Sequence, residues 1–286
     1  MRIAITGANG KLGRVVVKQL RDSEHTVVAL DQVGDRAPGF VRVDFTDYGQ
    51  TVDALSAIDG VHDGLDAVVH LAAVPASGLL PDATTFHNNM TATFNVLQGA
   101  RRAGIRTIVT ASSETVLGIP FDTPPPYLPI DESYDTRPES IYSLTKHLEE
   151  QLAAKLVRWD HELSITALRF SNVMDVADYA EFPAYDADPA IRKWNAWGYI
   201  DARDGAQAVE RALTLSRPGF DVFIIAAADT VMSRSSASLA ADIFPTVTVT
   251  KDLAEHETLL SIEKARALLG YEPKHFWRDH AAPLDA

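Results

Sequence analysis

Three glycines, each separated from the next by two residues, stand near the start of the chain at Gly7, Gly10 and Gly13. They follow directly on the apolar run Ile3–Ile5 and open a helical pattern. Glycine permits a tight turn at the first position, close approach of a pyrophosphate at the second and close helix–strand packing at the third. The pattern therefore predicts a strand, a turn and a helix N-terminus that bind a dinucleotide. The residues expected to contact it are Gly7, Asn9, Gly10, Lys11, Leu12 and Gly13.

Short apolar runs alternate with helical patterns along most of the chain. The runs are nearly continuous and mostly rich in Val and Ile, as in strands that are buried on both faces. They lie at Ile3–Ile5, Val27–Leu30, Phe40–Val43, Ala67–Leu71, Ile105–Ala111, Ile165–Leu168 and Val222–Ala226. The helical patterns cover Leu12–Arg21, Tyr48–Ala57, Ala83–Ala103, Glu139–Trp159 and Asp204–Leu215. This alternation predicts an α/β fold, a Rossmann-type doubly wound parallel sheet with ligands at the C-terminal ends of its strands.

The alternation becomes irregular after about Phe170. We therefore expect residues 1–170 to form the dinucleotide-binding domain. Residues 171–286 are expected to form a small C-terminal substrate-binding part, interleaved with the last strand and helices of the sheet. One more helix is predicted over Ser261–Leu269, because Gly270 is a favourable residue just beyond a helix end.

The composition excludes several kinds of site and partner. The chain of 286 residues has no cysteine, so it has no thiolate nucleophile, no cysteine-ligated zinc and no disulfide. Its nine histidines are scattered, and no metal site is expected. The formal net charge of −13 argues against nucleic acid and anionic membranes as partners.

The sequence also bears on where in the cell the protein is expected. It contains no run of about 18 apolar residues, so no transmembrane helix is expected. The first residues, Met1–Thr6, lead directly into a strand pattern, which is expected to leave no room for a signal peptide. A cytoplasmic location is expected, and the absence of cysteine is compatible with it.

Two aspartates follow the second and third apolar runs. Asp31 stands 18 residues beyond Gly13. A carboxylate at this point hydrogen-bonds the ribose hydroxyls of NAD and repels the 2′-phosphate of NADP, so NAD is the expected cofactor. Asp44 is expected to reach the adenine amine, and an exposed strand-end carboxylate is the alternative.

Tyr142 and Lys146 lie four residues apart in one predicted helix, so their side chains face the same way. A free tyrosine has a pKa of about 10 and is a poor base at neutral pH. We expect the ammonium of Lys146 to lower the pKa of Tyr142 and to hydrogen-bond the nicotinamide ribose. Ser113 is the candidate that holds a substrate oxygen while Tyr142 takes its proton and hydride leaves to NAD. A solvated helix face is the alternative interpretation of the Tyr–Lys pair.

Together these features resemble the extended short-chain dehydrogenase/reductase family, the NAD-dependent epimerases and dehydratases. The resemblance covers about residues 1–230. Its motifs are Thr6-Gly7-x-x-Gly10-x-x-Gly13, Asp31, Asp44, His70-Leu71-Ala72-Ala73, Asn89 with Thr93 and Asn95, Ser112-Ser113-x-x-Val116-x-Gly118, Tyr142-x-x-x-Lys146, Arg169-Phe170-Ser171-Asn172-Val173 and Tyr199-Ile200-Asp201-Ala202-Arg203-Asp204. It implies that Leu71, Ala72 and Ala73 line the cofactor and that Ser113, Tyr142 and Lys146 are catalytic. Asn89 is expected beside the cofactor, as a structural residue or a water holder.

One departure from the family bears on the substrate. Only 25 residues, Met174 to Gly198, lie where the sugar-nucleotide enzymes carry a long nucleotide-binding segment. This length is too short for a full uridine or thymidine diphosphate pocket. A small free sugar or sugar acid is therefore expected, and the compact uronate dehydrogenases look most similar.

The resemblance also implies substrate contacts. Arg192 resembles the arginine that grips a uronate carboxylate, a task that suits a guanidinium because it binds carboxylates bidentately; a surface arginine is the alternative. Glu114 stands where uronate dehydrogenases carry Asn, and its carboxylate would disfavour an anionic substrate unless it points away. It would instead bind sugar hydroxyls or help with proton transfer. The residues expected to bind substrate are Ser112, Glu114, Thr115, Asn172 and Arg192.

Three functions follow from these observations. The first is an NAD-dependent oxidoreductase with net oxidation of a small free carbohydrate. The second is a nucleotide-sugar epimerase or dehydratase, in which tightly held NAD takes up hydride and returns it. The third is a dinucleotide-sensing regulator without catalysis, a class that usually lacks the catalytic tyrosine. A homodimer formed through the helices Ala83–Ala103 and Glu139–Trp159 is a further hypothesis.

Overall fold

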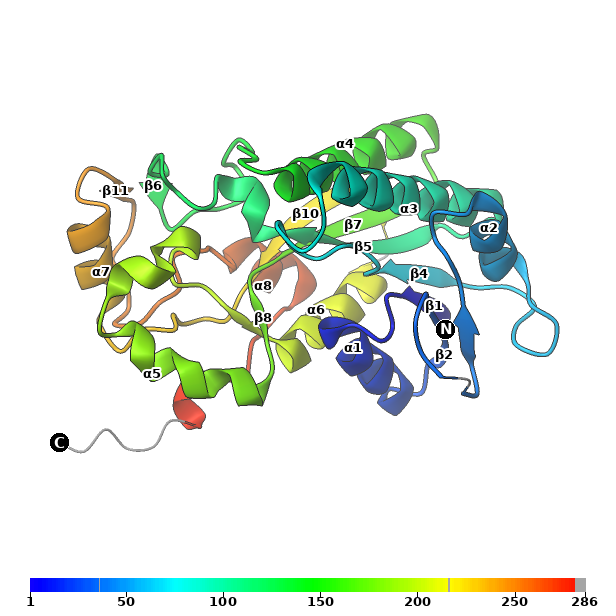
Figure 1. The fold of residues 1–286 in the computed structure, drawn as a ribbon, viewed down its shortest axis with the longest axis horizontal. Coiled ribbons are helices and arrows are strands. Elements are labelled where there is room, and N and C mark those ends of the chain that lie inside the picture. The colour runs from blue at the N-terminus through cyan, green and yellow to red at the C-terminus, as the bar shows by residue number, and fades with distance from the viewer. Residues whose placement is uncertain (36, 216, 281–286) are drawn as a thin grey trace.

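A sheet of seven parallel strands forms the centre of the molecule (Figure 1). The computed structural model describes residues 1–35, 37–215 and 217–280. The strands are β1 (Arg2–Thr6), β2 (Thr26–Asp31), β3 (Phe40–Arg42), β4 (Ala67–His70), β5 (Thr107–Ser113), β7 (Ser164–Phe170) and β10 (Gly219–Ile225). Each corresponds to one of the predicted apolar runs, and the predicted α/β fold class is confirmed.

The strand order, β10-β7-β5-β4-β1-β2-β3, reverses direction at β1. Ile3 pairs with Val27 of β2 on one side and with Ala67 of β4 on the other. In a doubly wound sheet a crevice opens at such a reversal, at the carboxyl ends of the strands. The glycine loop after β1 and the Leu71 segment after β4 therefore lie side by side at the place where such folds bind ligands.

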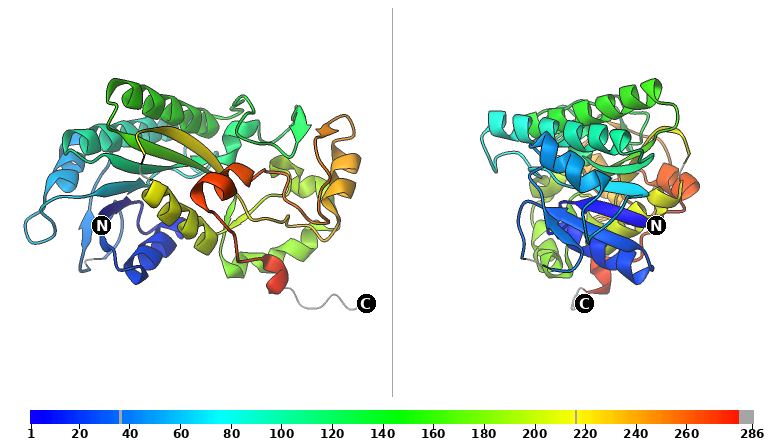
Figure 2. Two further views of the ribbon diagram at one scale, coloured as in Figure 1. Left: turned by 180° about the vertical axis from the view of Figure 1, so that it is seen from behind. Right: turned by 90° about the vertical axis from the view of Figure 1, so that its right-hand side faces the viewer.

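Helices cover both faces of the sheet (Figure 2). One face carries α2 (Tyr48–Ser56), α3 (Asp82–Arg102) and α4 (Ile141–Trp159), and the other carries α1 (Lys11–Asp22), α6 (Ala202–Leu215) and α8 (Glu263–Leu269). Each face has its own hydrophobic core: Ile3 of β1 packs in the cluster that contains Leu20 of α1, whereas Ala4 packs in the cluster that contains Val96 of α3. Burial on both faces is the reason for the continuous apolar runs.

The helix ends agree with their sequence signals. All six predicted helices are present, and α8 ends at Gly270, which has a φ of +65°. The helix α4 begins with a reciprocal cap, in which the Ser140 hydroxyl accepts from the Ser143 amide and the Ser143 hydroxyl accepts from the Ser140 amide. This cap fixes the first turn of the helix that carries Tyr142 and Lys146. None of the helices in the described residues is both long and apolar enough to cross a membrane.

The remaining elements are short, and most of them gather beyond one end of the sheet, at the left of Figure 1. The 3₁₀ helix η1 and the strand β8 follow closely on the carboxyl ends of β5 and β7, which places this part beside the ligand crevice. Sequence analysis assigned none of these pieces, because each is shorter than a clear periodic pattern requires. They are η1 (Glu114–Leu117), β6 (Tyr127–Leu128), β8 (Val173–Met174), η2 (Val176–Glu181), α5 (Phe182–Tyr185), η3 (Pro189–Asn195), β9 (Ile200–Asp201), α7 (Ser236–Ile243), β11 (Thr248–Val249) and η4 (Trp277–Asp279).

Candidate functional site

The glycine loop has the geometry that its spacing predicts. Gly7 has a φ of +68°, and a Cβ there would lie 2.7 Å from the Ala72 amide nitrogen. A Cβ on Gly13 would lie 2.0 Å from the Gly7 carbonyl oxygen. Any side chain at these two positions would push the loop away from β4 or from α1. Gly10 caps α1 without a side-chain hydrogen bond, so the first amides of the helix can bind an anion, as the phosphates of a dinucleotide require.

Asp31 lies against this loop at the end of β2. Its Oδ2 accepts a hydrogen bond from the Asn9 amide at 2.9 Å, and its Oδ1 accepts one from the Val33 amide at 3.2 Å. The side chain is buried, with 9% of the residue exposed. A carboxylate in this place faces the region in which the ribose of a bound dinucleotide would lie.

Asp44 holds the turn that precedes α2. Its Oδ1 accepts from the Thr46 amide at 2.9 Å and from Gln32 Nε2 at 3.1 Å, and the residue is exposed. A hollow of about 460 Å³ lies between this turn and the start of α3. Its lining residues are Thr46, Ala83, Thr84, His87, Asn88 and Thr91. The predicted contact of Asp44 with adenine stays a prediction.

The segment after β4 is fixed from two sides. The Thr6 hydroxyl accepts from the amides of Leu71 and Ala72, each at 3.2 Å. The side chain of Asn89, which is fully buried, accepts from the Val74 amide at 2.8 Å and donates to the Val74 carbonyl at 3.1 Å. Of the two roles expected for Asn89, the contacts fit the structural one. Its side chain holds the loop that contains Ala72 and Ala73.

Ser113, Tyr142 and Lys146 come together as expected. All three are buried, and Lys146 Nζ lies 6.0 Å from the centroid of the Tyr142 ring. The Ser113 hydroxyl lies near enough to the Tyr142 phenol to lower its pKa. The solvated-face alternative for the Tyr–Lys pair is therefore wrong. This cluster can hold an alcohol oxygen and exchange its proton.

The expected effect of Lys146 on Tyr142 needs a correction. Burial raises the pKa of the Tyr142 phenol, while the Lys146 ammonium and the Ser113 hydroxyl lower it. The contribution of Lys146 has the predicted sign, but burial outweighs it, and the pKa of Tyr142 stands above its ordinary value. The sequence could not indicate how completely the phenol would be buried.

Glu114 points inward, not away. The carboxylate accepts hydrogen bonds from the Ser171 hydroxyl at 2.5 Å and from Asn195 Nδ2 at 3.2 Å, and the residue is 3% exposed. Burial raises the pKa of Glu114 to about 7, although its two hydrogen-bond donors and the charge of Arg192 each lower it. At neutral pH this carboxyl group is therefore partly protonated.

Arg192 is also buried, so the surface alternative is wrong. Its guanidinium carbon lies 4.8 Å from the centroid of Trp194 and 5.2 Å from that of Tyr185, and its Nη2 donates to the Gly198 carbonyl at 3.2 Å. Within the described residues, its Nε and the Oδ1 of the fully buried Asn195 have no hydrogen-bond partner. These two atoms leave a donor and an acceptor free beside Glu114.

The other residues that were predicted to bind substrate do not all face the same place. The Ser112 hydroxyl donates to Glu150 Oε1 at 2.6 Å, next to the buried ion pair of Glu150 with Arg169, so its predicted contact with substrate is wrong. Successive side chains of a strand point to opposite faces, and Ser113 alone faces the phenol. The Thr115 hydroxyl donates to Ser113 Oγ at 2.9 Å. The Asn172 backbone amide lowers the pKa of Glu114.

Two residues of this region were missed by sequence analysis. Asn195 gave no signal, because a single asparagine near two tryptophans fits no motif. Glu149 gave a signal in its spacing, since it follows Lys146 by three residues and therefore shares its helix face. The described residues contain no group of three His, Asp or Glu side chains that could hold a metal ion.

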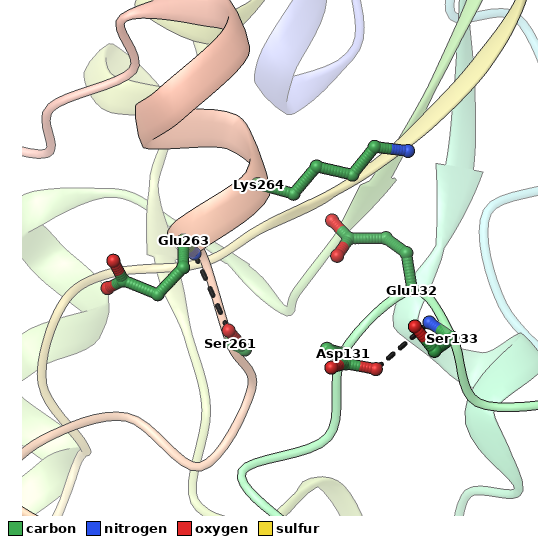
Figure 3. Close-up of a pocket in the computed structure, with 6 residues that line it drawn as sticks. All are labelled: Asp131, Glu132, Ser133, Ser261, Glu263 and Lys264. Carbon is green, nitrogen blue, oxygen red and sulfur yellow. Dashed lines mark hydrogen bonds between the residues drawn. The ribbon is translucent and has the colours of Figure 1, made fainter.

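A separate hollow of about 330 Å³ lies away from this cluster (Figure 3). It is lined by Asp131, Glu132, Ser133, Ser261, Glu263 and Lys264. Its polar groups already have protein partners: Glu132 Oε1 accepts from the Ile224 amide at 2.7 Å, and Asp131 Oδ1 accepts from the Ser133 amide at 2.9 Å. The Glu132 contact attaches the segment before α4 to β10, and the hollow is lined by none of the predicted site residues.

Comparisons with known proteins agree with this geometry. Residues 3–226 match the model of the NAD dependent epimerase/dehydratase family. The UDP-glucose 4-epimerase of Bacillus subtilis is 30% identical over 60% of this chain and 52% of its own length. The uronate dehydrogenase of Pseudomonas syringae is 31% identical over 54% and 53%. The L-arabinose 1-dehydrogenase (NAD(P)(+)) of Haloferax volcanii is 29% identical over 76% and 84%. The chain spans about half the length of the first two of these relatives.

A solved structure shows the same fold. It is that of a short-chain dehydrogenase/reductase superfamily protein from Agrobacterium tumefaciens, crystallised with bound NAD. The TM-score is 0.71 at 23% sequence identity, and the likeness covers 97% of this chain and 94% of that protein.

Proposed function

Because this chain belongs to the NAD dependent epimerase/dehydratase family, we propose that it is an NAD-dependent dehydrogenase that oxidises a hydroxyl of a small free sugar or sugar acid. The expected family resemblance is thereby confirmed, and the cofactor is NAD. The glycine loop, the free amides at the start of α1 and the buried Asp31 fit this cofactor. The residues on which the chemistry depends are Ser113, Tyr142 and Lys146.

The observation that carries the choice of substrate is the short segment between β8 and β9. Its two 3₁₀ helices and the short α5 pack tightly: Phe182 is fully buried, and its ring contacts those of Tyr199 and Trp277 at 5.3 and 5.7 Å. A segment filled by its own aromatic side chains leaves little space for a nucleoside diphosphate. Two of the relatives are named as dehydrogenases of free carbohydrates, which supports the same choice.

The buried polar groups in this segment suit a sugar. Arg192 and Asn195 leave one donor and one acceptor unused, and Glu114 adds a carboxyl group that is partly protonated near neutral pH. Such groups can hydrogen-bond several hydroxyls of one ring. Because Glu114 balances part of the charge of Arg192, both neutral sugars and sugar acids remain within the proposal.

The proposed chemistry begins with a sugar hydroxyl held by Ser113 and Tyr142. Bound NAD supplies the acceptor for the hydride that leaves the sugar carbon. Tyr142 takes the hydroxyl proton, so that a carbon–oxygen double bond forms as hydride and proton depart. Lys146 favours the phenolate and has an N–H group left for the nicotinamide ribose.

The test of the proposal is a panel of free aldoses, free uronic acids and sugar nucleotides, each offered with NAD. The expected result is stoichiometric NADH formation, seen by its absorbance, with at least one free aldose or uronic acid. Activity with sugar nucleotides alone would contradict the proposed substrate. Epimerised product without net NADH would favour the nucleotide-sugar epimerase, a candidate kept because the Bacillus subtilis relative bears that name.

Asp31→Ala is expected to lower the preference for NAD over NADP by about 10- to 100-fold, measured as the ratio of the two kcat/KM values. The variant loses a charged hydrogen bond to the ribose of NAD, and it no longer repels the 2′-phosphate of NADP. The companion variant Asp31→Asn keeps an acceptor for the Asn9 amide and separates loss of charge from loss of loop structure. The control is Asp22→Ala, which removes an exposed carboxylate of α1. An unchanged ratio in both Asp31 variants would remove Asp31 from the ribose site.

We further propose a homodimer formed through α3 and α4. Each of these helices has a large exposed apolar side chain, Phe94 on α3 and Trp159 on α4. A monomeric mass in light scattering at working concentration would contradict it. The cytoplasmic location expected from the sequence stays a prediction. The regulator without catalysis is not favoured, because Ser113, Tyr142 and Lys146 lie together.

A further inference from the structure

The candidate catalytic lysine is paired with a buried carboxylate on its own helix. Lys146 Nζ lies 2.9 Å from Glu149 Oε2 and donates to the Ala111 carbonyl at 3.0 Å. The two side chains of the pair are 4% and 7% exposed. A buried ion pair usually adds less stability than well-packed apolar residues of similar volume would, because both charges lose their hydration. With Lys146 in place, however, its buried ammonium requires a partner of opposite charge, and Glu149 supplies that partner.

We propose that Glu149 is a positioning residue for the reaction, which holds the Lys146 ammonium between its own carboxylate and the Ala111 carbonyl, beside the ring of Tyr142. This inference rests on the proposed function. Lysine has three N–H donors and a long flexible stem. Two of the donors are used here, so the third has a fixed direction and stays free for a ribose hydroxyl.

A chain of hydrogen bonds leads from the cofactor-lining segment to Thr93, whose hydroxyl lowers the pKa of this carboxylate. The Thr6 hydroxyl accepts hydrogen bonds from the Leu71 and Ala72 amides. The same hydroxyl lies 2.8 Å from His70 Nδ1, and His70 Nε2 lies 3.1 Å from the Thr93 hydroxyl. Burial and then the charge of Lys146 lower the pKa of His70 to about 3, so the ring is neutral and has one donor and one acceptor.

The donor and acceptor of each hydrogen bond in this chain follow from Thr6. Its hydroxyl oxygen accepts hydrogen bonds from two backbone amides, so the hydroxyl hydrogen is donated to His70 Nδ1. His70 then donates from Nε2 to Thr93, and the Thr93 hydroxyl lowers the pKa of Glu149. Glu149 of α4 therefore lies beside Thr93 of α3, at the end of a chain of hydrogen bonds that passes through His70 of β4 to the Leu71–Ala72 segment.

The charge of Glu149 also acts on the reacting phenol. It raises the pKa of Lys146, which keeps the ammonium protonated, and it raises the pKa of Tyr142, which opposes part of the effect of Lys146. Other charged or titratable groups surround the pair from α4, β4, β7 and η1. They are Glu150, His70, Arg169 (paired with Glu150) and Glu114.

Glu149→Gln separates positioning from charge, because glutamine has nearly the same shape and keeps an acceptor oxygen. Oxidation requires the phenolate, so kcat/KM rises with pH through the pKa of Tyr142. Removal of the negative charge lowers that pKa, and the rising limb of the pH profile is expected to move to lower pH. Glu149→Leu removes the acceptor as well and is expected to lower kcat by about 10- to 100-fold with little change in the KM for sugar. Glutamine is expected to retain more activity than leucine.

A second measurement does not depend on turnover. The ultraviolet absorbance of tyrosinate is followed after rapid pH jumps in the protein and in its Tyr142→Phe variant, and the difference isolates Tyr142. The same titration with Glu149→Gln is expected to be shifted to lower pH, and the control Glu162→Gln, which removes a carboxylate that is 76% exposed, is expected to leave it in place. An unshifted Tyr142 titration in folded Glu149→Gln would overturn the inference. If no sugar is oxidised but the titration shifts, the proposed function fails while the coupling of Glu149 to Tyr142 stands.

Discussion

Replacement of Tyr142 by phenylalanine is expected to lower kcat by about 10²- to 10⁴-fold, the usual contribution of a positioned general acid or base. In the proposed reaction the phenol oxygen takes the substrate proton, and it lies near the Ser113 hydroxyl and the Lys146 ammonium. Phenylalanine fills nearly the same buried volume and removes only that oxygen. The fold, and the affinity for NAD measured by calorimetry, are therefore expected to be unchanged.

The matched control for this variant is Tyr127→Phe, which removes a phenol oxygen that donates to Asp131 at 2.8 Å, away from the candidate site. It is expected to keep kcat within about twofold, in line with substitutions away from a reacting centre. Near-normal turnover of Tyr142→Phe would rule out the acid/base role. Loss of NAD binding in that variant would mean that the effect on kcat is not one of proton transfer.

Arg169→Leu is expected to destabilise the protein by about 3–5 kcal/mol, because it leaves a buried carboxylate without its partner. Arg169 Nε and Nη2 donate to the two oxygens of Glu150 at 2.9 and 2.8 Å, and both side chains are almost fully buried. The pair attaches α4 to β7, and the Ser112 hydroxyl of β5 completes it. The measurement is the free energy of unfolding from urea denaturation.

Two further variants test this interpretation. The double variant Arg169→Leu with Glu150→Leu removes both charges and is expected to recover much of the lost stability, since no unpaired charge is then buried. Lys18→Leu breaks an exposed pair with Asp22 on α1 and is expected to change stability little. A double variant as unstable as the single one would show that packing, and not the buried charge, is responsible.

The fold was predictable from sequence because its signals are long and redundant. The inner strands of the sheet are buried on both faces, so their apolar runs are nearly continuous, and the glycine loop fixes the strand–turn–helix start. The segment between Met174 and Gly198 gave no such signal. It consists of helices of four to seven residues held by aromatic contacts and by Arg192, and such contacts depend on distant parts of the chain.

The residues of the candidate site could be predicted from the sequence, whereas the pKa values of their side chains could not. Spacing alone brought Tyr142 and Lys146 onto one helix face, and alternation along β5 could have separated Ser112 from Ser113. Burial, which raises the pKa values of both Tyr142 and Glu114, could not be predicted from residue spacing. The spacing of Glu149, three residues after Lys146, places its carboxylate on the same helix face, but the burial of this pair could not be predicted.

The most direct measurement of the central claim is a crystal structure of the protein with NAD bound. The expected result has the pyrophosphate on the amides of the Gly7–Gly13 loop, the nicotinamide ring facing the Tyr142 phenol and the Ser113 hydroxyl, and the ribose of that ring within hydrogen-bonding distance of Lys146. A nicotinamide ring bound away from the Tyr142 phenol, or a protein that takes up neither NAD nor NADP, would contradict it.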